Sequence, residues 1–478
     1  MDNHHVIKIL IRHGILTLAL FAALGVSGFA EPLPRLSVSG DSIVDQTGKR
    51  VAFTGLHITN ESWGYWQYPV SDSLNELGEH PFLPQKKFPS YSLQEIDFKN
   101  IEHLSPFLVR YELSYSVFEK DNPLREKNME QFKSHIERFN SMGIYVVPVL
   151  HFGPGLNLSV AHYEDKKHGD KRVKTIFEDS TLFFKHRDWW IYVANELKGI
   201  SGIAGYQIYV EPRVPSAAEG GYDVFVKRTK ELVAAIRALD PHRIIIVHTA
   251  FSREANPGER YWSPTLKRMV TDTGEQGIIW SASSDFRRDG VEFFYKIDDP
   301  NIVYAFSAYV PYDFCSEGAR PRGKDGYSGE FFKSAMREFI APRIDFGKKH
   351  GVPVIVDEFG VNHQQPRFDA QLWLKSVLAV FEEAQLPSWF YLYKGSANPW
   401  SGSVHNYGIY TYINLSPVEI QITDEGYHFP NFVSEPAQRT GFDTLFSTYF
   451  FSNSGMKTLS LTNNQDIKKI LMNFFSRR

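Results

Sequence analysis

Short apolar runs alternate with longer stretches of helical periodicity along most of this chain. Eight of the runs have the length and the β-branched or aromatic content of buried strands, and they cover residues 51–56, 107–111, 144–150, 205–210, 243–248, 301–307, 352–358 and 388–393. Between them, apolar positions recur on one helix face and predict helices at residues 128–142, 189–198, 222–239, 330–349 and 369–384. A stretch beginning at Phe442 is expected to supply the last helix.

This alternation of strands and helices predicts a parallel α/β sheet, and eight units predict closure into a (β/α)8 TIM barrel. An open doubly wound sheet is the alternative, but no glycine-rich dinucleotide turn follows the first strand. Residues 35–45 predict a small N-terminal hairpin, and residues 157–185, 251–298 and 395–438 are interpreted as long βα-loop insertions. We expect one domain over residues 31–478.

The first 30 residues have the pattern of a signal peptide. Lys8 and Arg12 precede an apolar run at 14–26, and small residues at 27–30 suit cleavage after Ala30. The run is short for a membrane span, and no later stretch is apolar enough to be one. We therefore expect an exported protein, periplasmic or extracellular.

Composition narrows the classes of function. Hydrophobic residues make up 42% and charged residues 22% of the 478 positions, which is typical of a globular protein. The net charge of −3 gives no support to nucleic-acid binding. The single cysteine, Cys315, excludes an intramolecular disulfide, so stability must come from a core. Most of the aromatic residues are expected in that core, but Trp63 and Trp66 lie in a ring-rich loop expected to form a wall of a sugar-binding cleft.

Two glutamates end predicted strands that are far apart in the sequence. The apolar run 354–356 leads into Glu358, and Gly360 allows a sharp turn directly afterwards. Glu211 ends the run that begins at Gly205, and Pro212 stops that strand. Barrel enzymes carry their chemistry at such strand ends. Glycoside hydrolysis uses two carboxylates, which lie about 5–5.5 Å apart in retaining enzymes. We therefore expect Glu358 to be the nucleophile and Glu211 the acid/base.

At these positions the chain resembles glycoside hydrolase family 5, the cellulase family of retaining barrel glycosidases. The similarity rests on Glu211-Pro212, on the run from Asp357 to Gly360, and on residues 43–51 before Gly55. It implies further site residues: Arg110 holding the nucleophile ionised, His151 lining the cleft, Tyr309 bonded to the nucleophile, and Tyr393 or Trp400 as sugar platform.

The chain also departs from the family pattern. Val210 stands where the family has Asn before the acid/base, and Ser307 stands where a His-x-Tyr motif has His. The last strand carries tyrosines in place of the family's Trp. These differences leave a second hypothesis open, a non-catalytic carbohydrate-binding protein on the same scaffold. Contacts of Arg110 and Tyr309 with Glu358 would favour the enzyme, and a buried Glu211 would favour the binder.

Other kinds of chemistry have weaker signals. His57, His248 and His363 lie at or after strand ends, but no HExxH pattern supports a zinc site. No G-x-S-x-G elbow points to a serine hydrolase. The sequence thus predicts an exported retaining glycosidase that cleaves β-linked glucan-like oligosaccharides or polysaccharides. We expect a monomer that needs no metal or organic cofactor, binds no nucleic acid and has no membrane span once the signal peptide is removed.

Overall fold

The chain divides into two units, Met1–Leu33 and Pro34–Arg478, and the following account concerns the second. The computed structural model describes residues 32–58, 79–80, 83–87, 93, 95–123, 125–152, 155, 175–215, 221–252, 260–263, 268–271, 292–315, 327–361, 367–396, 408–412, 421–423, 426–428, 458–459 and 462–476. The predicted signal peptide, Trp63, Trp66, His363 and Trp400 lie outside these residues.

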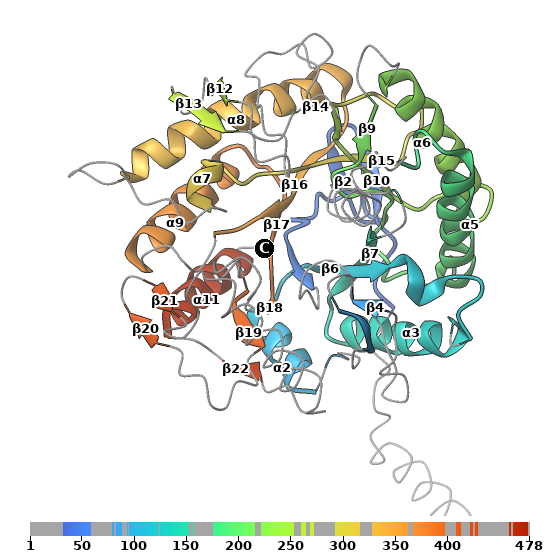
Figure 1. The fold of residues 1–478 in the computed structure, drawn as a ribbon, viewed down its shortest axis with the longest axis horizontal. Helices are drawn as coiled ribbons and strands as arrows, with labels where there is room; N and C mark the ends of the chain where they lie inside the picture. Colours follow the sequence, from blue (N-terminus) through green and yellow to red (C-terminus); the bar gives the residue numbers. More distant parts are fainter. Residues whose placement is uncertain are drawn as a thin grey trace, which may run out of the picture. The chain divides into compact units, whose positions relative to one another are not determined.

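Eight parallel strands close into a barrel (Figure 1). They are β3 (Gly55–Ile58), β6 (Leu108–Ser114), β7 (Tyr145–Phe152), β8 (Tyr206–Gln207), β10 (Ile245–His248), β15 (Ile302–Ser307), β16 (Val354–Phe359) and β17 (Ser388–Phe390). Each strand pairs in parallel with its neighbours in the sequence, and β17 pairs with β3 to complete the ring. The predicted TIM barrel is confirmed.

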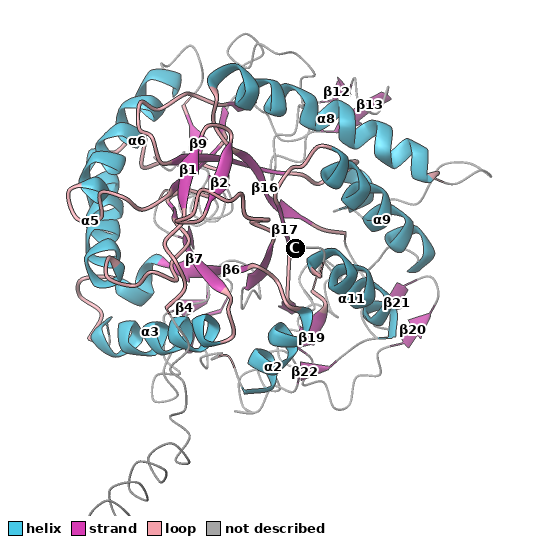
Figure 2. Cartoon of the chain, turned by 180° about the vertical axis from the view of Figure 1, so that it is seen from behind, coloured by secondary structure: helices cyan, strands magenta, loops and turns pink. Residues whose placement is uncertain are grey.

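Helices surround this barrel (Figures 1 and 2). They are α2 (Glu95–Leu104), α3 (Arg125–Ser141), α5 (Ser180–Leu197), α6 (Gly221–Arg237), α7 (Tyr312–Cys315), α8 (Gly329–His350), α9 (Arg367–Glu383), α11 (Thr462–Phe475) and the 3-10 helix η1 (Tyr115–Phe118). In α5, the buried positions Phe183, His186, Trp190 and Val193 recur every three or four residues. The Asp179 side chain caps the N-terminus of α5.

Short strands add small sheets. The predicted N-terminal hairpin is present as β1 (Ser37–Ser39) and β2 (Ser42–Val44). Further small groups of strands lie beyond the barrel in the part of the chain that the structure describes. They are β4 (Glu79–His80) with β5 (Leu83–Lys87), β9 (Arg213–Val214) with β11 (Ala250–Ser252) and β14 (Glu292–Phe293), β12 (Arg260–Ser263) with β13 (Arg268–Thr271), β18 (Lys394–Ser396) with β19 (Tyr410–Tyr412) and β22 (Thr458–Leu459), and β20 (Gln421–Thr423) with β21 (Gly426–His428). Several of them fall in the predicted loop insertions.

The bounds of two strands differ from the prediction in ways that affect the site. The first strand begins only at Gly55, because Phe53 has a φ of 43° that extended structure does not allow. Gly55 is required there, since an added Cβ would lie 2.6 Å from the side chains of Leu108 and Trp389. The second strand runs on to Ser114, three residues past the predicted end, and so includes Glu112.

The core is rich in aromatic rings, as predicted. Trp190, Trp373 and Trp389 are fully buried, and the Trp389 indole donates to the carbonyl of Phe53 at 2.9 Å. Cys315 is buried and free, and burial raises the pKa of its thiol well above the usual value. Among the helices of the described residues, none is long and apolar enough to cross a membrane.

Candidate active site

Glu358 lies at the C-terminal end of β16, where two side chains hold its carboxylate. Arg110 Nη1 of β6 donates to Oε1 at 2.5 Å, and the Tyr309 hydroxyl donates to Oε2 at 3.1 Å. The carboxylate is buried, so each bond forms in a medium that strengthens it. Both contacts are those expected from the sequence, and both favour an enzyme over a binding protein.

Arg110 is fully buried and makes bonds in three directions. Besides Glu358, its Nε donates to Gln207 Oε1 at 2.6 Å, and Nη1 lies 2.7 Å from His57 Nδ1. Nη2 lies 3.5 Å from Asp357 Oδ2. Burial disfavours the charge of Arg110, but the carboxylates of Glu358 and Asp357 outweigh it and raise the pKa of Arg110. A fixed cation therefore faces the carboxylate of Glu358.

A second group of buried side chains lies around Asp357. Gln207 Nε2 donates to Asp357 Oδ2 at 2.5 Å, and His248 Nε2 lies 3.4 Å from Oδ1. Burial would raise the pKa of Asp357, but His248 and Arg110 lower it to about 2. Asp357 is therefore ionised, and it fixes the side chains of its neighbours in the barrel interior.

His248 is a cation at neutral pH. Burial would lower its pKa, but the negative charges of Asp357 and, more weakly, Glu211 raise it to about 9. Its Nε2 also lies 3.2 Å from Ser307 Oγ. An imidazole from β10 thus lies beside the serine that stands in place of the family's histidine. In the sequence, His248 stands out only as a possible zinc ligand, and its place beside Ser307 has no local signal.

Glu211 follows β8 in a strained conformation. Its φ of 42° lies in the left-handed region, which is costly for a residue with a side chain and is typical of functional sites. Glu211 is partly exposed, whereas Val210 before it is buried. The charge of Glu211 acts on His248, and His248 contacts Asp357, which directly precedes Glu358. His248 is therefore a common neighbour of the two strand ends that carry Glu211 and Glu358. Glu211 is thus neither buried nor remote from the Glu358 end of the barrel.

Glu112, which lies beyond the predicted end of its strand, contacts two histidines. His57 Nε2 lies 2.9 Å from Glu112 Oε2, and His151 Nδ1 lies 3.1 Å from Oε1. Burial opposes the charge of Glu112, but the interactions with His151 and His57 bring its pKa well below the usual range. Burial, followed by the charge of Arg110, lowers the pKa of His57 to about 4. Glu112 is therefore ionised and His57 neutral near neutral pH.

His57, Glu112 and His151 place one ligand atom each within 4.8 Å of one another, as a metal site would. The donor set does not fit a metal. Arg110 has only donors, so His57 Nδ1 must accept from it, and the proton of the neutral ring is on Nε2, toward Glu112. That nitrogen has no lone pair for an ion, and a guanidinium lies beside the ring. The predicted zinc alternative with His248 is also unsupported, because His248 contacts Asp357 and Ser307.

The predicted sugar platform Tyr393 is fully buried, and its hydroxyl donates to Asp97 Oδ1 of α2 at 2.9 Å. The ring of Tyr391 lies instead beside the site, 4.8 Å from the His57 ring and 6.3 Å from the Tyr309 ring. His151, predicted to line the cleft, has a side chain that is 13% exposed.

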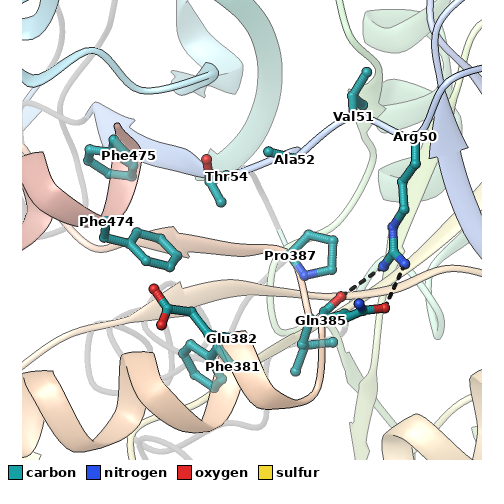
Figure 3. A pocket seen from close by; sticks show the side chains of 11 residues that line it. Arg50, Val51, Ala52, Thr54, Phe381, Glu382, Gln385, Pro387, Phe474 and Phe475 are labelled. Carbon is teal, nitrogen blue, oxygen red and sulfur yellow. Dashed lines mark hydrogen bonds between the residues drawn. The ribbon is translucent and has the colours of Figure 1, made fainter. Parts of the chain in front are cut away.

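A pocket of about 400 Å³ lies at the opposite end of the barrel, where the chain enters β3 and β17 (Figure 3). Arg50 crosses it and donates to the side chain of Gln385 at 3.1 Å and to its carbonyl at 2.9 Å. Phe474 and Phe475 of α11 also line the pocket. Since Glu358 lies at the carboxyl end of β16 and Glu211 follows the carboxyl end of β8, this pocket is separate from the candidate active site.

A closed barrel with a buried Glu358 and a partly exposed Glu211 at its strand ends is compatible with glycoside hydrolysis. The family model of cellulase, glycosyl hydrolase family 5, matches residues 105–394, well over half of the chain. The chain belongs to this family: it is a glycosidase that hydrolyses glycosidic bonds in polysaccharide degradation.

Solved structures support the fold. The chain is similar to a GH5-4 broad specificity endoglucanase from Clostridium acetobutylicum, with a TM-score of 0.50 and 16% identity over 75% of this chain and 91% of that one. It is also similar to one from Clostridium longisporum, with a TM-score of 0.50 and 14% identity over 89% and 96%. No curated protein matches the chain.

Proposed function

We propose that this protein is a retaining glycoside hydrolase that cleaves β-linked glucan-like oligosaccharides or polysaccharides through a glycosyl-enzyme intermediate. The observation that carries the proposal is the carboxylate of Glu358, which receives one bond from Arg110 and one from Tyr309. Such partners fix the orientation of a nucleophile.

In the first step Glu358 attacks the anomeric carbon, and Glu211 donates its proton to the leaving oxygen. Each oxygen of Glu358 accepts one hydrogen bond and keeps a lone pair, so either can form the glycosyl bond. In the second step Glu211 removes a proton from water, which attacks the same carbon and releases Glu358. The cationic ring of His248 stabilises Glu211 whenever Glu211 is ionised.

The substrate-facing residues are proposed from the same geometry. Tyr391 is 7% exposed and its ring lies beside His57 and Tyr309, so it is a better candidate for a sugar platform than Tyr393, which is 0% exposed and packs away from the site. His151 is proposed to line the cleft. Aromatic rings suit the apolar faces of glucose units, which agrees with a glucan-like substrate. The platform roles of Trp63, Trp66 and Trp400 stay predictions.

The remaining proposals come from the sequence. Residues 1–30 act as a signal peptide, residues 31–478 form one catalytic domain, and the mature monomer acts in the periplasm or outside the cell without a cofactor. The carbohydrate-binding alternative is not favoured, because Glu211 is partly exposed and both partners of Glu358 are present.

Sugar release from β-glucans, mannans, xylans and aryl β-glycosides tests the proposal. We expect release by the wild type, none by Glu358→Gln, and unchanged release by Glu383→Gln, an exposed glutamate of α9 paired with Arg337. The first-formed anomer, followed by NMR, should keep the β configuration of the substrate. An inverted product, or a Glu358→Gln variant as active as the wild type, would exclude the proposed mechanism.

A further inference from the structure

A chain of hydrogen bonds continues behind Arg110, away from Glu358. We infer that Glu112 and His57 are positioning residues for Arg110: Glu112 fixes the proton of His57 on Nε2, so that Nδ1 accepts from the guanidinium nitrogen that holds Glu358. This inference rests on the proposed function, because Arg110 matters for the reaction only if Glu358 takes part in it.

The strands place the three side chains together. His57 of β3 pairs in register with Arg110 of β6, and Glu112 is two residues further along β6, on the same face. Tyr111 between them points outward and bonds His135 of α3 at 2.8 Å, which confirms the alternation. Successive distances are 2.9 Å from Glu112 to His57, 2.7 Å from His57 to Arg110 Nη1 and 2.5 Å from Nη1 to Glu358.

The direction of each bond follows from the groups involved. An ionised carboxylate only accepts and a guanidinium only donates, so the ring between them has to donate to Glu112 and accept from Arg110. A neutral imidazole does this in one tautomer, with its proton on Nε2. The other tautomer would set two N–H groups against each other at the 2.7 Å between His57 Nδ1 and Arg110 Nη1. Glu112 therefore selects the tautomer that Arg110 needs.

The choice of tautomer is important because the side chains of this hydrogen-bond chain are buried. His57 and Arg110 are fully buried and Glu112 nearly so, which leaves no bulk water to replace a lost acceptor. With its acceptor in place, Nη1 lies between His57 and Glu358, and Nε is held by Gln207. Since Arg110 is inaccessible to a substrate, disturbing this arrangement should lower kcat and leave KM nearly unchanged.

His57 can be replaced so that its two nitrogens are tested separately. The side-chain oxygen of asparagine lies near the place of Nδ1, so His57→Asn keeps an acceptor for Arg110 and loses the bond to Glu112. The longer His57→Gln reaches toward Glu112 and leaves no acceptor at the Nδ1 position. In both variants Glu112 keeps His151 as a partner.

Kinetics of these variants on the best substrate of the panel test the inference. We expect Glu112→Gln and His57→Gln to lower kcat about tenfold or more while KM changes less than about twofold. His57→Asn should keep most of the wild-type kcat, and adding Glu112→Gln to it should lower kcat no further. Glu196→Gln, a glutamate of α5 paired with Lys133 at 2.6 Å, is the control and should resemble the wild type.

Several outcomes would overturn the inference. One is a Glu112→Gln variant that melts earlier but keeps its kcat; another is a loss that persists undiminished in the His57→Asn background. Equal kcat in His57→Asn and His57→Gln would also contradict it, and this pair decides the matter if Glu112→Gln fails to fold. A chelator that inactivates the wild type, with recovery on adding Zn²⁺, would replace the positioning role by a metal site.

The Glu358→Gln variant separates this inference from the proposed function. If Glu358→Gln is inactive and Glu112→Gln behaves like the wild type, only the positioning role fails. If Glu358→Gln stays active, the proposed function fails and the positioning role with it.

Discussion

Replacing Tyr309 by phenylalanine isolates one of the two bonds that hold Glu358. The Tyr309 hydroxyl donates to Oε2 at 3.1 Å. A hydrogen bond to a charged group contributes about 1.5–3 kcal/mol. Bonds between a hydroxyl and a carboxylate are usually about 2.5–2.7 Å long. The Tyr309 bond is longer, so its contribution belongs at the lower end of the energy range, near about 1.5 kcal/mol. A loss of about 1.5 kcal/mol corresponds to about a tenfold fall in kcat/KM.

The structure offers a matched control for this variant. Tyr206 at the start of β8 is also buried, and its hydroxyl donates to Asp240 Oδ2 at the same 3.1 Å, outside the candidate site. Tyr206→Phe and Tyr309→Phe should therefore lose similar stability in urea titrations, but only Tyr309→Phe should lose kcat/KM on an aryl β-glycoside. A Tyr309→Phe enzyme within about twofold of the wild type, or an equal loss in Tyr206→Phe, would refute the reasoning.

Three further predictions concern Arg110, Glu211 and two buried histidines. Arg110→Lys should fold but lose most of its kcat in steady-state assays, because lysine has one nitrogen where the guanidinium makes three bonds; kcat near the wild-type value would contradict this. Glu211→Gln should be far slower on polysaccharides than on aryl glycosides whose leaving group needs no proton, and equal losses on both would exclude Glu211 as the acid. Burial lowers the pKa of His135 to about 4 and of His186 to about 3. Near pH 6.5 these histidines bind protons in the unfolded chain but not in the folded one. Lowering the pH from 7 to 5 should therefore reduce the free energy of unfolding by about 2 kcal/mol for each histidine. Denaturant titrations at the two pH values check this, and equal stabilities would contradict it.

The barrel, and the placing of one glutamate near the end of each of two strands, could be predicted from the sequence because both depend on local patterns. Apolar runs mark barrel strands that are covered on both faces. Glu211 directly follows such a run, and Glu358 is separated from one only by Asp357. Glu112 was missed because the run ended at Tyr111, and a charged residue argues against a buried strand. The strand continues because His57 and His151 stabilise that charge, and both come from other strands. A single sequence does not show such pairings.

The sequence also did not predict which tyrosine of the last strand lies beside the site. Tyr391 and Tyr393 are two residues apart, and in a continuing strand their rings would lie on one face. The last barrel strand ends at Phe390, so this alternation no longer holds at Tyr391. One ring reaches the site and the other packs on α2. Apolar patterning does not predict where a strand of this kind ends.

The place of His248 has a consequence for how such proteins are compared. The chemical group beside Ser307 is an imidazole, although the residue at that position in the chain is a serine. An alignment column records the strand that carries a group, and not where that group lies in the folded protein. A classification that requires histidine in the sixth-strand column would set this chain aside as defective. A classification based on where an imidazole lies in the folded protein would keep this chain in the family.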